Sequence, residues 1–143
     1  MIRKASEAGI LFIAASGSSK TNNDARPHYP ASYNTGRVIS VAASDRNDAL
    51  ASFSNYGAKS VHLAAPGAAI LTTALGNEYE LRSGTSMAAA TVAGVAVLGL
   101  SAHPDFSLDQ LRSLLLQSVD RLPDLRGKVS TSGRINAARA VAR

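Results

Sequence analysis

The sequence predicts an α/β domain with three layers, in which helices cover both faces of a mostly parallel β-sheet. Short, continuous apolar runs such as Ile10–Ala15 and Val38–Ala43 are bounded by turn residues, and strands covered on both faces have this pattern. A longer apolar stretch, Met87–Leu100, has the length of a helix. Because strand-like and helix-like segments alternate along the chain, a parallel sheet with helical crossovers is favoured.

Composition limits the possible classes of protein. The 143 residues fit a single domain over residues 1–143, and 45% apolar with 17% charged residues argue against disorder. Without cysteine there is no disulfide framework, thiolate metal site or thiol nucleophile. No run of 18 apolar residues and no signal-peptide pattern is found, so no membrane contact is expected.

The net charge of +5 is concentrated near the C-terminus, in Arg121–Arg143. A basic segment of this kind could bind a polyanion, but it has no interleaved aromatic residues and no nucleic-acid motif. A solvated helical tail is the favoured interpretation, so we expect no nucleic-acid partner.

The first half of the chain is predicted to contain one helix and two strands. Residues 2–8 are compatible with a helix that ends at Gly9. Strand Ile10–Ala15 is followed by a long irregular connection, Ser18–Gly36, and loops of that length are often functional. Strand Val38–Ala43 then ends in the turn Asp45–Asp48.

Short strands and a hairpin follow. Val61–Ala65 and Ala69–Thr73 are predicted as strands around Pro66-Gly67. The pair Gly76-Asn77 predicts a hairpin turn that joins Ile70–Ala74 to Tyr79–Arg82.

Three helices complete the prediction. Met87–Leu100 is apolar on every side, so we expect it to be buried in the middle of the domain. Ser107 begins the next helix as an N-cap, with Gln110 completing a capping box. A last amphipathic helix is predicted over Arg134–Arg143. In the helix that begins after Ser107, the apolar face is expected to consist of Leu111, Leu114, Leu115 and Val119.

The pentapeptide Gly84–Ala88 is the sharpest chemical signal, because it places Ser86 at the start of the apolar helix. A hydroxyl there lies beside an unpaired helical N–H, and acyl transfer needs a nucleophile next to an oxyanion donor. Gly84 would let substrate approach the backbone. The alternative is an ordinary helix cap by Thr85 or Ser86. Ala88 does not fit the G-x-S-x-G nucleophile elbow.

The wider sequence resembles the subtilisin-like serine proteases, or subtilases. Ser83–Ala96 (SGTSMAAATVAGVA) is similar to the nucleophile helix of that family. The resemblance covers nearly the whole chain and implies a subtilisin-like fold. Further similar blocks are Phe12–Ser18 (FIAASGS), Tyr29–Tyr33 (YPASY), Ala51–Gly57 (ASFSNYG), Ala64–Ile70 (AAPGAAI) and Gly133–Ala138 (GRINAA).

The resemblance also implies residue roles. Ser86 would be the nucleophile, and its N–H, with Thr85 close by, would bind the oxyanion. The family's oxyanion-hole asparagine falls on Ser18, whose hydroxyl is shorter than a carboxamide. The family's Pro-His after Ser-Met-Ala reads Ala90-Thr91 here. Substrate would be bound by Ala14, Ala15, Ser16, Gly17 and Gly84.

Two members of the expected triad are absent from the sequence. Subtilases carry an Asp-Ser/Thr-Gly block and a His-Gly-Thr block upstream of the serine, and neither string occurs here. The three histidines are predicted to lie on the loop surface (His28), at a strand edge (His62) and at the far end of the long helix (His103). The chain therefore resembles the C-terminal half of a subtilase catalytic domain.

Two functions follow from this resemblance. One is a serine endopeptidase of polypeptides that lacks its triad Asp and His, is inactive alone and depends on the missing N-terminal half. The other is a truncated pseudoprotease that acts as a peptide-binding or structural module. In either case strand Ile10–Ala15 would have a bare edge. No cofactor is expected beyond a weak possibility of structural calcium near Asn22–Asp24, and the family makes a secreted location plausible.

Overall fold

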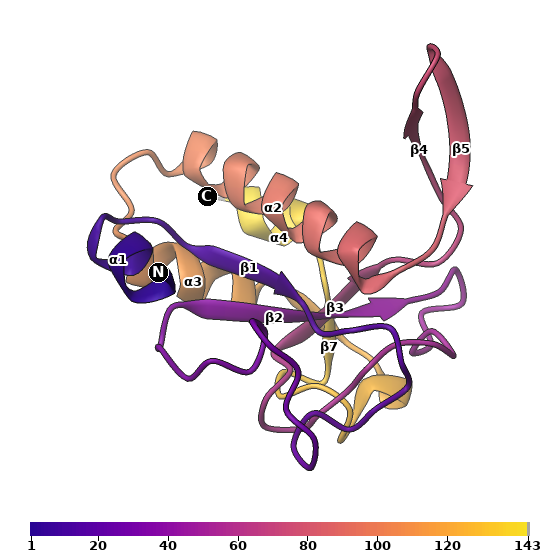
Figure 1. Cartoon of the computed structure of the whole chain (residues 1–143). Helices are drawn as coiled ribbons and strands as arrows, with labels where there is room; N and C mark the ends of the chain where they lie inside the picture. Colours follow the sequence, from indigo (N-terminus) through magenta and orange to yellow (C-terminus); the bar gives the residue numbers. More distant parts are fainter. Residues whose placement is uncertain (143) are drawn as a thin grey trace.

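The computed structural model describes residues 1–142, which form a five-stranded sheet, a layer of helices and a separate two-stranded ribbon (Figure 1). The sheet has the order β1-β2-β3-β7-β6. All neighbouring pairs are parallel except β6 and β7, so the predicted mostly parallel sheet is confirmed. The strands are β1 (Phe12–Ala15), β2 (Val38–Ser44), β3 (Leu63–Pro66), β6 (Val119–Arg121) and β7 (Gly133–Ile135).

Strand β2 is the centre of the core, and every one of its residues is buried. Side chains of a strand point alternately to the two faces of the sheet. Ile39 and Val41 accordingly belong to the apolar cluster beneath the helices, whereas Ala42 belongs to the cluster on the other face. This explains the unbroken apolar sequence of the strand, because both faces are covered.

Helices cover one face of the sheet: α2 (Thr85–Ala102), α3 (Leu108–Gln117) and α4 (Ala137–Val141). The predicted capping box at the start of α3 is confirmed, with the Ser107 hydroxyl accepting from the Gln110 N–H and the Gln110 side chain accepting from the Ser107 N–H. By length and composition, α2 would be able to cross a membrane. It instead packs on β1, β2 and β3 as a core helix.

The opposite face has a thinner cover, made of the short helix α1 (Ile2–Glu7), the 3₁₀ turn η1 (Pro123–Leu125) and loops. Leu125 and Val129 pack against Ala42 and Ala64 of the sheet. The three-layer α/β class is therefore confirmed, with one layer built mainly from short segments.

The hairpin prediction is also confirmed. Strands β4 (Ile70–Ala74) and β5 (Glu78–Arg82) pair in antiparallel fashion, and Gly76 and Asn77 in the turn have φ angles of 80° and 61°. The ribbon projects from the body of the molecule and leads directly into α2 (Figure 1).

The predicted helix over Arg134–Arg143 is wrong in its first part. Residues 133–135 form β7, and Asn136 then caps α4, which ends at Val141. Burial of Ile135 against the sheet, opposite Val119 in β6, outweighs the helical pattern. Val119 therefore lies on a strand, and not on the apolar face of α3 as expected. The position of Arg143 is outside the described residues.

The expectation that α2 is buried on all sides is wrong for three residues of its outer face, Val97, Leu98 and Leu100. Its inner face is buried at Ala88, Val92, Val95, Ala96 and Gly99. On its outer face, Val97 is 67% exposed, Leu98 51% and Leu100 38%. Strand β1 lies at the edge of the sheet beside this face. We call the outer face of α2 (Val97, Leu98 and Leu100) together with the unpaired edge of β1 the open side.

Candidate active site

The first turn of α2 is bonded to the residues that follow β1. The Gly17 N–H donates to Thr85 Oγ1 over 3.1 Å, and the Thr85 N–H donates to Ser18 Oγ over 3.2 Å. The two hydroxyls of Ser18 and Thr85 lie 3.2 Å apart. Thr85 itself is 1% exposed. These bonds fix the start of the helix against the carboxyl end of the edge strand.

Ser86 is the second residue of α2, and its side chain is exposed. Within residues 1–142, the Ser86 N–H donates no hydrogen bond. An unpaired N–H in the first turn of a long helix lies at the positive end of the helix dipole and attracts negative charge. The structure therefore puts a free hydroxyl next to a free backbone donor.

Gly84 has no side chain to fill the space between the Ser86 N–H and the Ser18 hydroxyl. A Cβ at this position would lie 3.8 Å from the Ser86 nitrogen and 3.9 Å from Ser18 Oγ. Gly84 is the N-cap residue of α2, and no side chain of its own helix caps the turn. An ordinary cap by Thr85 or Ser86 is therefore the wrong interpretation, because Thr85 is already helical and bonds to Gly17.

The predicted substrate strand runs beside this helix start. Ala14 and Ala15 belong to β1, and Ser16 and Gly17 continue the chain toward Ser18. Ser16 and Gly17 are buried, whereas Ser18 is exposed. All of the predicted site residues are thus brought to one junction, between the end of β1 and the start of α2.

Asn55 holds this junction together and was not singled out by the sequence patterns. It is 2% exposed, and its Oδ1 accepts from the N–H groups of Ser19 and Thr21 at 2.9 and 3.0 Å. Its Nδ2 donates to the Ser16 carbonyl and to Asn23 Oδ1. No local signal reveals this role, because the partners of Asn55 are 32 to 39 residues away in the chain.

Gly17 is required by the same arrangement. Its φ is 107°, and a Cβ there would collide with the Asn55 amide, whose Cγ would be 3.0 Å away. The His28 ring also borders this point, with Cδ2 3.1 Å from that Cβ position. The backbone after β1 therefore passes through a space that only glycine fits.

No histidine in residues 1–142 hydrogen-bonds to Ser86. His28 is an exposed loop residue, as predicted. His103 lies at the opposite end of α2, stacked on Phe106 with ring centroids 4.5 Å apart. His62 precedes β3, and its Nδ1 accepts from the Ser40 N–H over 2.9 Å. Burial and the nearby Arg112 charge lower the pKa of His62 to about 4.

The loop oxygens at Asn22–Asp24, where a structural calcium was weakly expected, accept hydrogen bonds within the protein. The Asp24 carboxylate accepts from the Ser60 hydroxyl and from the N–H groups of Ser60 and Lys59. Burial acts to raise the pKa of Asp24, but these hydrogen bonds and the Lys59 charge lower it overall. Asn22 Oδ1 accepts from the Asp24 N–H, and Asn23 is buried. The described residues contain no cluster of His, Asp or Glu that would hold a metal.

Comparison with known proteins gives a consistent result. The model of the subtilase family (Peptidase_S8) matches residues 1–136. The thermostable alkaline protease of Halalkalibacterium halodurans is 39% identical over 141 residues, which cover 97% of this chain and 36% of that protease. Subtilisin-like protease 2 of Plasmodium falciparum is 49% identical over 90 residues, covering 63% of this chain and 7% of that protein.

A solved structure agrees with the sequence comparisons. A chain of the subtilase cytotoxin SubAB assembly superposes with a TM-score of 0.82 at 26% identity, covering 97% of this chain and 50% of that chain. The chain spans less than half the length of the first curated relatives that it matches. With the family model matching almost from end to end, the chain belongs to the subtilase family.

Proposed function

We propose that this chain carries the nucleophile and part of the substrate-binding surface of a serine endopeptidase. The observation that supports this most directly is the Ser86 site. Ser86 has both an exposed hydroxyl and a free N–H, and it lies at the start of an 18-residue helix. Hydrogen bonds that join Thr85 to Gly17 and Ser18 hold this helix start against the residues that follow β1. Membership of the subtilase family supports the same chemistry.

In the proposed reaction, Ser86 Oγ attacks the carbonyl carbon of a peptide bond. The oxygen–carbon bond forms, the carbon–nitrogen bond breaks, and the proton of the hydroxyl passes through a base to the leaving amine. Water then hydrolyses the acyl-enzyme and restores the Ser86 hydroxyl. The substrate strand would lie along Ala14–Gly17, and Gly84 would leave room for the carbonyl.

The oxyanion would be bound by the Ser86 N–H and by the Ser18 hydroxyl. Ser18 Oγ already accepts from the Thr85 N–H. When the Thr85 hydroxyl also donates to Ser18, the proton of Ser18 becomes free to donate to the substrate oxygen. Each such donor aimed at the developing charge lowers the barrier to acyl transfer.

The base and its carboxylate would come from a further part of a longer chain, which also covers the open side. Three observations support this part of the proposal. None of His28, His62 and His103 bonds to Ser86. The outer face of α2 exposes large apolar side chains. The relatives extend well beyond the matched region.

The decisive experiment measures hydrolysis of a fluorogenic peptide library by the longest natural chain that contains these residues. Turnover is expected for that chain and is expected to fall to background in Ser86→Ala. Ser101→Ala, an exposed serine at the other end of α2, is the matched control and should retain full turnover. Undiminished hydrolysis by Ser86→Ala would contradict the proposal. The 143 residues alone are expected to be inactive.

A second candidate function is a pseudoprotease that binds peptides or acts structurally. It is favoured by one observation, namely that the short Ser18 hydroxyl is engaged with Thr85 where the family has a carboxamide. The variant Ser18→Asn separates the two functions. The peptidase proposal predicts a higher kcat in this variant, because a longer donor reaches the oxyanion. Saturable peptide binding with no turnover in either form would instead support the pseudoprotease.

We also propose that the protein acts outside the cell. A related protein from Natrialba magadii, 39% identical over 139 residues, is described as a halolysin-like extracellular serine protease. Fractionation of the source culture tests this proposal. Detection of the Ser86 peptide only in the medium is expected, and its retention inside the cells would contradict the proposal.

A further inference from the structure

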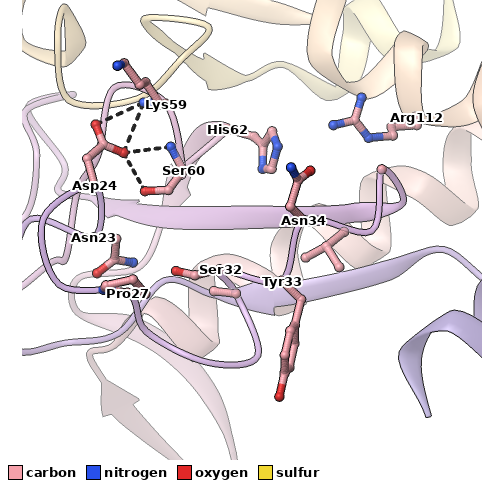
Figure 2. A pocket seen from close by; sticks show the side chains of 13 residues that line it. Asn23, Asp24, Pro27, Ser32, Tyr33, Asn34, Lys59, Ser60, His62 and Arg112 are labelled. Carbon is pink, nitrogen blue, oxygen red and sulfur yellow. Dashed lines mark hydrogen bonds between the residues drawn. The ribbon is translucent and has the colours of Figure 1, made fainter.

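A cavity of about 360 Å³ lies apart from the Ser86 site and shares no lining residue with it. Its walls come from three separated segments: the loop before β2, the residues just before β3, and one side chain of α3 (Figure 2). The polar side chains that matter here are Asn34 from the loop, His62 from the segment before β3, and Arg112 from α3.

Arg112 is a half-buried cation without a counterion among the described residues. Its Nε is inaccessible to solvent and has no hydrogen-bond partner among residues 1–142. No carboxylate of the described residues lies within 4.0 Å of its guanidinium. Figure 2 shows the guanidinium pointing across the cavity toward His62. The buried Nε–H is left without an acceptor, which is unfavourable, so an acceptor supplied from outside would be attracted to this edge of the guanidinium.

His62 contributes a second donor to the same space. Because its Nδ1 accepts from the Ser40 N–H, the single proton of the neutral ring is carried by Nε2. The ring stays neutral at physiological pH, since burial and the Arg112 charge lower its pKa to about 4. Within residues 1–142 this Nε2–H has no acceptor. The neutral imidazole is thus a donor beside a cation, and it does not repel that cation.

The remaining polar groups around the cavity fit the same kind of ligand. The Asn34 side chain lies between His62 and Arg112 in Figure 2. The hydroxyls of Thr35, which follows Asn34 in the chain, and of Ser40, whose N–H bonds to His62, are buried and have no partner among the described residues. Of the buried side-chain atoms that lack a partner among the described residues, Arg112 Nε is the one whose residue lines this cavity.

The one carboxylate in the cavity lining does not neutralise Arg112. Asp24 lies at the other end of the cavity from Arg112 in Figure 2. Its oxygens already accept from the Ser60 hydroxyl at 2.7 Å, from the Ser60 N–H at 2.8 Å and from the Lys59 N–H. Asp24 is therefore not a counterion of Arg112.

We propose that this cavity binds a small oxyanion, a carboxylate or a phosphate, whose oxygens accept from Arg112, from His62 Nε2–H and from the Asn34 amide. A guanidinium edge presents two parallel N–H groups that match both kinds of oxyanion. The site does not depend on the proposed peptidase activity, because no residue of the Ser86 junction takes part. Carboxylate and phosphate share the chemistry shown here, and the experiment separates them.

The test follows the Nε–H signal of Arg112 by ¹⁵N NMR in the longest natural chain that contains these residues. Sodium phosphate and sodium acetate are titrated separately, with sodium chloride holding the ionic strength constant. A saturable shift of the Arg112 signal with a millimolar midpoint is expected for one of the two anions, and that anion identifies the ligand class. Equal, non-saturable shifts in phosphate, acetate and chloride would overturn the proposal.

Two variants and one control sharpen this test. Arg112→Met keeps an unbranched side chain as far as the position of Nε and removes the charge, so at least a tenfold loss of affinity is expected. Binding to the variants is followed by the backbone amide signal of Ser40, which bonds to residue 62. His62→Asn keeps an oxygen for the Ser40 N–H and removes the Nε2 donor, so a several-fold loss is expected. Arg126→Met changes an exposed arginine elsewhere and should bind as the unchanged protein does. Unaltered affinity in Arg112→Met would also overturn the proposal, and the NMR titration decides if that variant does not fold.

Discussion

The two sides of the junction between β1 and α2 differ in burial: polar groups on one side are buried and hydrogen-bonded, whereas apolar side chains on the other are exposed. On one side, which we call the closed side, Ser16, Asn23, Asn55 and Thr85 are buried and all of them are hydrogen-bonded. On the open side, Val97, Leu98 and Leu100 are exposed and one edge of β1 has no partner strand in the described residues. The described residues therefore satisfy the hydrogen bonds around the site, but they do not cover the apolar side chains of the open side.

This difference separates two requirements for function. The hydrogen bonds that hold the start of α2, and with it Ser86, come from residues 16–85 of this chain. Exposed apolar side chains next to a free strand edge are typical of a surface that another segment covers. Substitutions on the closed side are thus expected to disturb the position of Ser86 and the stability of the fold, whereas substitutions on the open side are expected to have little effect on the 143 residues alone.

The largest expected effect is at the centre of the closed side. Asn55→Ala removes both the acceptor for two backbone N–H groups and the donor to Ser16 and Asn23. Because several buried groups lose their partners at once, the free energy of unfolding should fall by about 3–5 kcal/mol. Urea unfolding measures this change. A loss below about 1 kcal/mol would show that the closed side is not held by this side chain.

A matched pair on α2 compares the two faces directly. Val92 is fully buried on the inner face, so Val92→Ala should cost about 2–3 kcal/mol through lost burial and a new cavity. Leu98→Ala on the outer face should change stability of the 143 residues by no more than about 0.5 kcal/mol. Thermal unfolding of both variants gives the comparison. Equal losses would mean that the open side is covered within this chain.

The pH dependence of stability is the third prediction. The pKa of His62 is about 4 in the folded chain, against 6.5 for the unperturbed group. The unfolded chain therefore binds the extra proton first as the pH falls. Stability should be complete above pH 6.5 and should decrease by about 2 kcal/mol between pH 7.5 and pH 5.

Denaturant unfolding at the two pH values in chloride buffer measures this loss, and His62→Asn provides the control. The variant is expected to lose about 2 kcal/mol less than the unchanged chain over the same interval. An identical pH dependence in the two proteins would show that His62 is not the group responsible.

The smallest expected effect is a gain on the open side. A Cβ at Gly94 would meet no atom within 4 Å, and the residue lies inside α2. Gly94→Ala should therefore stabilise the 143 residues by about 0.5–1 kcal/mol through helix propensity alone. At Gly99, on the inner face, a Cβ would lie 2.9 Å from Leu114 Cδ2, so Gly99→Ala should show a smaller gain or none. The shift in melting temperature measures the stability change in both variants. A lower melting temperature in Gly94→Ala would contradict the exposed position of Gly94.

Local patterns in the sequence predicted most of the fold. The unbroken apolar runs identified β1 and β2, Gly76-Asn77 identified the hairpin, and Ser107 with Gln110 identified the start of α3. Each of these signals acts over a few residues, which is why it is readable without a structure. The apolar composition of α2 predicted a helix correctly, but it did not reveal which of its faces is covered.

The parts that failed depend on contacts that are distant in sequence. Strand β7 replaced the start of a predicted helix because Ile135 pairs opposite Val119 in β6. The role of Asn55 and the cavity around Arg112 arise only when separate segments meet. The position of Ser86 was predictable as a helix start, whereas the bond between the neighbouring Thr85 and Gly17, just after β1, was not.

The most direct test of the central idea is covalent labelling of the serine by a fluorophosphonate, followed by peptide mass mapping. In the longest natural chain that contains these residues, a single adduct on Ser86 is predicted, with no adduct after Ser86→Ala and none in the 143 residues alone. Labelling at another residue, or no adduct in a chain that hydrolyses peptides, would contradict the assignment of Ser86 as the nucleophile.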